Sequence, residues 1–177
     1  MKRQTVFHLI SEITRQAGVS CILIGGFAVN YHKVTRQTAD VDFLITKDDF
    51  NKISNFLEKA GYKQTSLHEN FIQLESSQPY LMDVDFMFVE RETFERMQAE
   101  GERLDISGRQ FVVPSLAHLI ALKLHAIKHN PEIRIDRDLP DILNLIRINK
   151  VDVNDNQFKE LCLKYGTEEI YRRIRGL

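Results

Sequence analysis

Apolar residues in the first part of the chain follow two different spacings, which separate helices from strands. Residues 6–17 carry them at the three-to-four spacing of an amphipathic helix, and Gly18 is a natural end for it. The run 21–24 is short, apolar and β-branched, and Gly25-Gly26 follows it directly. This pattern predicts a buried strand that ends in a tight turn, from which a short helix over 27–31 departs.

Strand patterns dominate the middle of the chain, with one helix between them. Thr46 is suited to cap the start of a helix that carries Phe50, Ile53 and Leu57, and Gly61 to end it. The apolar residues over 80–89 give the strongest strand signal in this part of the chain. The other expected strands are 41–45, 62–67 and 71–74, with a hairpin from 106 to 113 that turns at Ser107-Gly108.

The pattern changes at Ser115, after which the periodicity is helical. It predicts a long helix from Ser115, a second over 137–148 and one or two more over 156–175. We therefore expect an α+β protein with an α/β core over 1–113. A helical region over 114–177 would pack on that core as a bundle.

The composition of the chain is that of a globular protein without a membrane helix. The chain has 177 residues, of which 43% are hydrophobic and 28% charged, as in ordinary globular proteins. No run approaches the roughly 18 apolar residues of a membrane helix, and Met1–Thr5 does not open a secretory signal, so we expect a cytoplasmic protein with no membrane partner. The net charge of −1 argues against tight non-specific nucleic-acid binding but leaves a transient nucleic-acid substrate open.

Paired carboxylates inside an apolar strand are the first sign of chemistry. Asp40 directly precedes the strand expected at 41–45, and Asp42 lies on it. Residues two apart in extended chain share one face, so these two carboxylates project together while Val41 and Phe43 point into the core. Two adjacent carboxylates repel each other unless a positive charge lies between them. Their hard oxygen atoms suit Mg²⁺, or Mn²⁺, that also binds substrate phosphates.

A second acidic strand offers the third carboxylate that a two-metal displacement uses. Asp83 and Asp85 share a face and interrupt the apolar strand 80–89, where an unpartnered charge is costly. Either of them could complete the site if the two strands pair. Gly25-Gly26 would let the backbone approach a phosphate at the start of the next helix.

Together these residues resemble the DNA-polymerase-β-like nucleotidyltransferase superfamily. The match lies in Gly25, Gly26, Asp40 and Asp42, with Asp85 the better match for the third carboxylate and Asp83 the competing one. The resemblance implies a mixed sheet with flanking helices. It also implies metal-dependent transfer of a nucleoside monophosphate from a nucleoside triphosphate, such as ATP, to an acceptor hydroxyl, with Asp40, Asp42 and Asp85 catalytic and Asp85 also a candidate base.

Further segments are similar to a narrower group. Residues 36–42 resemble the Arg-x-Thr-x-Asp-x-Asp loop of small bacterial members, and residues 119–126 and 136–142 resemble segments of AbiE-type toxin nucleotidyltransferases. This similarity implies an antitoxin partner and an acceptor that is tRNA or other RNA, a protein, or a small molecule such as an aminoglycoside. It also implies that Arg36, Thr38 and Lys123 contact the nucleotide and that Asp138 and Asp141 serve the acceptor or support the site.

Several of these residues have a second interpretation. Lys123 lies on an apolar helix and needs an anion, which is either a triphosphate or Asp138 and Asp141, unless its side chain reaches solvent. Arg36 is either a phosphate ligand or an exposed loop residue. Asp138 and Asp141, three apart, either position Lys123 or an acceptor, or cap and solvate their helix.

For two other clusters we favour a structural role over a functional one. His125 and His129 have the spacing of a zinc pair without a third ligand, which favours a plain helix surface. The arginines 172, 173 and 175 either contact RNA or form the basic end of a last helix. The alternative to an enzyme is a non-catalytic nucleotide-binding or protein-interaction module that retains the fold.

Overall fold

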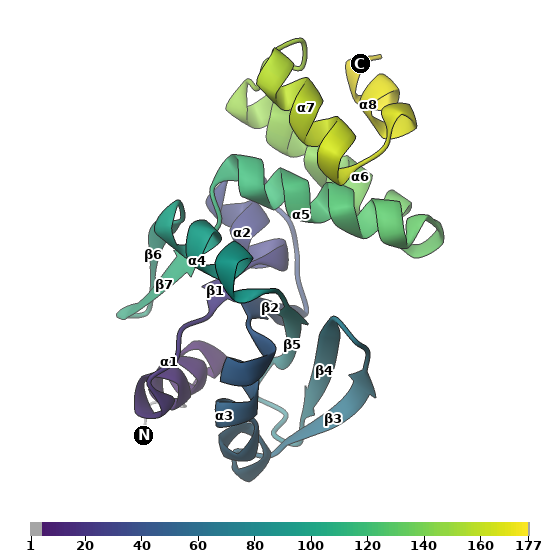
Figure 1. Cartoon of the computed structure of the whole chain (residues 1–177). Coiled ribbons are helices and arrows are strands. Elements are labelled where there is room, and N and C mark those ends of the chain that lie inside the picture. Colours follow the sequence, from purple (N-terminus) through teal and green to yellow (C-terminus); the bar gives the residue numbers. More distant parts are fainter. Residues whose placement is uncertain (1–4, 177) are drawn as a thin grey trace. The chain divides into compact units, whose positions relative to one another are not determined.

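The chain forms a mixed seven-stranded sheet with helices, seen in a computed structural model that describes residues 5–176 (Figure 1). The expectation that no secretory signal opens the chain rests in part on residues 1–4, which lie outside the described residues. The strand order is β3-β4-β5-β2-β1-β7-β6. The strands are β1 (Ile22–Leu23), β2 (Asp40–Ile45), β3 (Tyr62–Leu67), β4 (Phe71–Ser76), β5 (Asp83–Phe88), β6 (Glu102–Ile106) and β7 (Arg109–Val113).

Three pairings form the centre of the sheet. Strand β2 runs parallel to β5, and β1 runs antiparallel to β2 and parallel to β7. Hairpins β3–β4 and β6–β7 extend the two edges. The mixed sheet and the surrounding helices confirm the α+β fold class expected from the sequence.

The helices fall in two groups. Four of the helices in residues 5–176 lie before residue 115: α1 (Val6–Ala17), α2 (Gly25–Tyr31), α3 (Lys47–Lys59) and α4 (Arg91–Ala99). The other four in this range follow it: α5 (Leu116–His129), α6 (Pro131–Asn149), α7 (Asn156–Tyr165) and α8 (Glu168–Arg175). Among the described residues, none of these helices is long and apolar enough to cross a membrane.

The chain divides into two compact units. The first contains the residues up to Ala28 together with Gln37–Pro114, and the second contains Val29–Arg36 together with the helices from Ser115 onward. The sequence division at 113/114 lies next to the start of the long helical segment. The short segment 29–36, which the sequence places in the α/β half, groups with the helices instead.

An aromatic core covers one face of the sheet in the first unit. Phe43 of β2 stacks on Phe86 of β5, with ring centroids 5.7 Å apart. Phe50 of α3 packs on Phe86 at 5.2 Å, and Phe7 of α1 packs on Phe111 of β7 at 5.7 Å. Because side chains alternate along a strand, this packing directs Asp42 and Asp85 to the other face.

Two strands have other bounds than expected: β5 begins at Asp83 rather than at 80, and β6 begins at Glu102 rather than at 106. Three helices also differ from the sequence expectations. Helix α2 starts at Gly25 itself, so no separate turn precedes it. Helix α6 starts at Pro131, six residues before the expected 137, because Pro is accepted in a first helical turn. Helix α4 was not expected at all, since Phe94 and Met97 are its only buried residues and give too short an apolar stripe to recognise.

Thr46 caps α3 as expected and also contacts an ionic network around the buried carboxylate of Asp49. Its hydroxyl accepts a hydrogen bond from the Asp49 N–H at 3.2 Å. The Asp49 carboxylate is 2.7 Å from Lys52 Nζ and 2.8 Å from Arg91 Nη1 at the start of α4. Burial disfavours its charged form, but hydrogen bonds from Arg91, Lys52 and Thr46 outweigh burial and lower the pKa of Asp49 to about 2.

Replacing Asp49 by Asn should lower the free energy of unfolding by about 2 kcal/mol at pH 7. A folded pKa of about 2, below the usual 3.8, gives stability that is present above pH 3.8 and lost as the pH falls toward 2. The difference between Asp49→Asn and wild type in urea unfolding should therefore shrink to about half at pH 3. Asp48→Asn, at an exposed position in the same turn, is the control, and an equal loss in both variants would contradict the assignment.

Candidate functional site

Three carboxylates meet on the sheet face opposite the aromatic core. Strands β2 and β5 are in register, so Asp42 lies beside Asp85. One oxygen atom from each of Asp40, Asp42 and Asp85 lies within 4.8 Å of the others, and all three residues are half-buried. Within residues 5–176, this is the one group of three or more acidic, His or Cys side chains arranged to hold a metal ion.

Asp83, the competing third carboxylate, lies outside this group. It is exposed, and its Oδ1 accepts a hydrogen bond from the backbone N–H of Ser76 on β4 at 2.9 Å. It neighbours Asp40 in the strand register, one pleat away from Asp85. The structure thus brings Asp85, and not Asp83, together with Asp40 and Asp42.

Gly25 is required at the site by the position of Asp42. The Ile24 N–H donates to the Asp42 carbonyl oxygen at 2.9 Å, which holds the next residue beside the Asp42 side chain. A Cβ atom on Gly25 would lie 1.8 Å from Asp42 Oδ2, and Gly25 also has a φ of +60°. Both the space and the backbone conformation therefore exclude a side chain.

Gly26 and Thr38 form the adjoining side of the site. A Cβ atom on Gly26 would lie 2.7 Å from Thr38 Cβ, so the glycine lets the Thr38 segment lie close. The Thr38 hydroxyl is 3.0 Å from Asp40 Oδ1 and 3.1 Å from the Asp40 carbonyl oxygen, and both can accept its proton. Thr38, expected to contact nucleotide, thus contacts a carboxylate of the group.

Gln73 of β4 is a site residue that the sequence analysis missed. Its side-chain nitrogen donates to Asp85 Oδ2 at 3.0 Å. The signal was present in the strand pattern, because Gln73 is the polar residue between buried Ile72 and Leu74 and so faces the same way as the acidic residues.

Lys123 lies in the second unit and is paired with two carboxylates. Its ammonium nitrogen, on α5, is 2.8 Å from Asp138 Oδ1 and 2.7 Å from Asp141 Oδ2, both on α6. All three residues are buried. The sequence left a triphosphate or these two aspartates as the anion that binds Lys123, and in the structure the two aspartates bind it.

Arg36 joins the same charge cluster. Its guanidinium is 2.5 Å from Asp141 Oδ2, and its backbone N–H and C=O both bond to the Asn30 side chain. Arg134 lies 3.8 Å from the second oxygen of Asp138. The two buried carboxylates are thereby balanced by cations within the second unit.

The two weaker clusters have ordinary surroundings. His125 and His129 have ring centroids 4.2 Å apart, and burial, followed by the nearby His129 and Lys128 charges, lowers the pKa of His125. On α8, Arg172 and Arg173 pair with Glu168 and Glu169 one turn earlier at 2.5 and 2.6 Å. Both arrangements match the interpretation of a plain helix surface.

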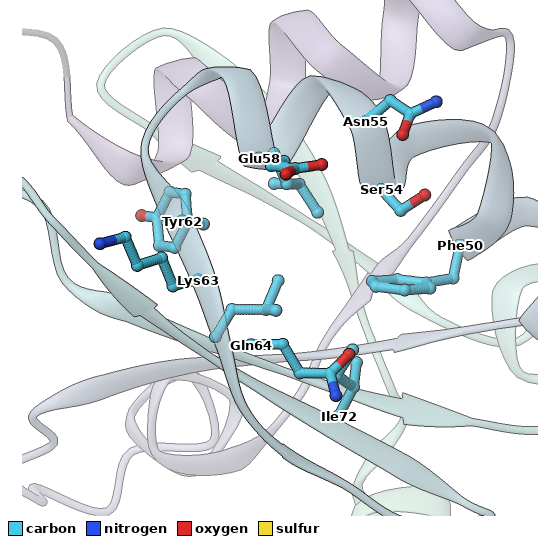
Figure 2. Close-up of a pocket in the computed structure, with 10 residues that line it drawn as sticks. Phe50, Ser54, Asn55, Glu58, Tyr62, Lys63, Gln64 and Ile72 are labelled. Atoms are coloured by element: carbon cyan, nitrogen blue, oxygen red, sulfur yellow. The ribbon is translucent and has the colours of Figure 1, made fainter.

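A separate pocket of about 390 Å³ lies between α3 and the β3–β4 hairpin (Figure 2). Phe50, Glu58, Tyr62 and Ile72 are among the residues that line it. Ile72 points to the opposite sheet face from Gln73, so this pocket is on the other side of the sheet from the three carboxylates.

A protein-family model that matches nearly the whole chain shows to which family the chain belongs. The model, described as an uncharacterised nucleotidyltransferase, matches residues 5–177. The chain belongs to this nucleotidyltransferase family. Its membership in the polymerase-β-like superfamily, expected from the glycine and aspartate motifs, is confirmed, while the narrower likeness to AbiE-type toxins stays a prediction.

Solved nucleotidyltransferase structures share the fold. The antibiotic-resistance factor ANT(2″)-Ia, solved with adenylyl-2″-tobramycin, has a TM-score of 0.60 and 14% identity, covering 97% of this chain and 95% of that one. A lincomycin-bound lincosamide antibiotic adenylyltransferase, LnuA, has a TM-score of 0.54 and 18% identity over 78% and 93%. An antigenic nucleotidyltransferase-like protein from Paracoccidioides brasiliensis has 0.57 and 16% over 88% and 83%.

Among curated proteins, the similarity is to two Bacteroides fragilis proteins named large ribosomal subunit protein bL25. Each is 28% identical over 125 residues, which is 65% of this chain and 62% of the relative. The chain thus spans less than two thirds of the length of these curated relatives, and the ribosomal name describes those proteins.

Replacing Gly25 by Ala should abolish divalent-metal binding, because the new methyl group would displace the Asp42 carboxylate. Gly18→Ala is a matched control, since Gly18 has a similar φ of +65° but no atom within 4 Å of the added Cβ. Mn²⁺ titration followed by electron paramagnetic resonance measures the binding. Unchanged Mn²⁺ affinity in Gly25→Ala would show that the contact has no bearing on the site.

Replacing Lys123 by Met should destabilise the protein by about 3 kcal/mol, because it leaves two buried carboxylates short of a cation. The measurement is the urea midpoint, compared with Lys128→Met at an exposed position of the same helix. Equal midpoints for the two variants would mean that the cluster contributes nothing to stability.

Proposed function

We propose that this nucleotidyltransferase transfers a nucleoside monophosphate from a nucleoside triphosphate to an acceptor hydroxyl, with the help of a divalent cation. The observation that carries the proposal is the convergence of Asp40, Asp42 and Asp85 on two in-register parallel strands. Membership in the nucleotidyltransferase family supports the reaction class.

The three carboxylates fit Mg²⁺ or Mn²⁺. They supply hard, anionic oxygen atoms from one half-buried surface, and three such groups so close together are unfavourable without a cation. Asp40, Asp42 and Asp85 would hold the metal, which when bound neutralises charge on the triphosphate and on the reacting oxygen atoms.

Gly25 and Gly26 provide the side on which the triphosphate would lie. Neither has a side chain, and the carboxylate of Asp42 occupies the space that a Cβ on Gly25 would need. Their backbone N–H groups, in the first turn of α2, would bind phosphate oxygen atoms.

The acceptor hydroxyl attacks the α-phosphorus atom in the proposed reaction. A new bond forms between the acceptor oxygen and phosphorus, the bond to the β-phosphate oxygen breaks, and pyrophosphate leaves. Asp85 takes the proton of the hydroxyl. Aligning the acceptor and the triphosphate beside the carboxylates supplies much of the rate.

Arg36 and Lys123 would act differently from the sequence expectation of direct nucleotide contact. Both already pair with carboxylates of the helical unit, and Lys123 is buried there. We therefore assign them, with Asp138 and Asp141, to holding helices α5 and α6 and the segment that ends at Arg36.

A small hydroxyl-bearing molecule is the acceptor we propose first. The net charge of −1 does not favour a polyanion, and ANT(2″)-Ia, which matches nearly the full length of both chains, was solved with an adenylylated aminoglycoside. RNA and protein acceptors, and a toxin restrained by an antitoxin, are the other outcomes that the experiment separates.

The experiment is a labelling assay with each α-labelled nucleoside triphosphate and Mg²⁺. Wild type is mixed separately with aminoglycosides and lincosamides, total RNA and cell protein. Label should move to one acceptor class with wild type and fall at least 100-fold with Asp42→Ala, because one metal ligand is lost. A folded Asp42→Ala variant with normal transfer would refute the assignment.

Asp85→Asn and Asp83→Asn separate the two aspartates of β5 in the same assay. Transfer should be lost in Asp85→Asn and retained in Asp83→Asn, whose amide oxygen can still accept the Ser76 hydrogen bond. No transfer to any acceptor, together with no triphosphate binding by wild type, would favour a non-catalytic module.

A further inference from the structure

We infer that Gln73 is a positioning residue that fixes the orientation of the Asp85 carboxylate for metal binding. The inference rests on the proposed function, because it concerns the same three carboxylates. It adds a strand, β4, to the part of the sheet that forms the site.

The contact follows from the strand register. Strand β4 runs antiparallel to β5, and Gln73 lies directly opposite Asp85. The two side chains point to the same face, and Gln73 Nε2 is 3.0 Å from Asp85 Oδ2. An ionised carboxylate can only accept hydrogen bonds, so the glutamine must present its nitrogen to it.

The backbone of Gln73 is held from its other side. Strand β3 has an irregularity between Gln64 and Ser66, and Ser66 pairs with Gln73. The intervening Thr65 places its hydroxyl 3.3 Å from the Gln73 carbonyl oxygen, to which it donates. A β-bulge of this kind redirects side chains and is common beside functional sites.

The consequence concerns how the carboxylate rotates. An aspartate side chain turns about two bonds, and a donor fixed on one oxygen selects one orientation of the whole group. Thr38 provides the equivalent contact to Asp40 on β2. Such partners of metal ligands set the affinity of the metal, typically by about 10- to 100-fold.

The sheet also contains a matched pair without any link to the three carboxylates. On the β6–β7 hairpin, Gln110 Nε2 donates to Asp105 Oδ2, also at 3.0 Å. Both of these residues are exposed. Removing this donor therefore reproduces the loss of a Gln–Asp hydrogen bond within the same sheet.

The test uses the full chain with Gln73→Met, which keeps the length but removes the donor, and Gln73→Thr, which suits a strand but is too short to reach Asp85. Gln110→Met is the control. Mn²⁺ binding is measured by electron paramagnetic resonance, and transfer is measured against Mg²⁺ concentration. Melting temperature reports folding.

Both Gln73 variants should bind Mn²⁺ about 10- to 100-fold more weakly than wild type. The Mg²⁺ concentration for half-maximal transfer should rise by a similar factor with the acceptor KM unchanged. Gln110→Met should match wild type. Folded Gln73 variants with wild-type Mn²⁺ affinity, or an equal loss in Gln110→Met, would overturn the inference.

The outcomes also separate this inference from the proposed function. Wild type that binds Mn²⁺ but transfers no label, with weaker Mn²⁺ binding in the Gln73 variants, would refute the transfer reaction and support the positioning role. Wild type that transfers label, together with Gln73 variants whose Mn²⁺ binding is unchanged, would support the transfer reaction and refute the positioning role.

Discussion

Repulsion between carboxylates held on adjacent strands is the constraint on which the rest of the site depends. The parallel, in-register pairing of β2 and β5 places Asp42 beside Asp85, and Asp40 lies on the same face of β2. The aromatic packing of Phe43 and Phe86 on the other face makes this arrangement unavoidable, because a slip of one residue would bury the acids. A cation between these carboxylates would offset their repulsion, which is the reason for the metal site that we propose.

The neighbouring residues are explained by the same constraint. The Asp42 carboxylate occupies the space that a side chain on residue 25 would need, so this residue is glycine. The Thr38 side chain in the same way excludes a side chain on Gly26. Thr38 and Gln73 each donate to one member of the group. Two donors and two glycines thus lie around the three carboxylates, as the preorganised metal site that we propose would require.

In the second unit, cationic side chains neutralise the buried carboxylates. Asp138 and Asp141 are buried on α6, and Lys123 and Arg36 of the same unit neutralise them. One fold can carry many different functions, so the acceptor that we propose would be selected by surfaces outside the carboxylate group.

The sequence by itself determined most of the sheet strands, though only the last residue of β6, and the capped helix after Thr46. It also determined the helical last third and the face on which Asp40 and Asp42 lie, because hydrophobic periodicity and local capping act within a few residues. It left the third carboxylate open between Asp83 and Asp85, left Lys123 with three alternatives and missed Gln73. Only the tertiary structure decided these, since each depends on a partner across strands or helices: Ser76 for Asp83, Asp138 and Asp141 for Lys123, and Asp85 for Gln73. Which strands become neighbours and which helices pack together depends on contacts between residues far apart in the chain, which no local pattern encodes.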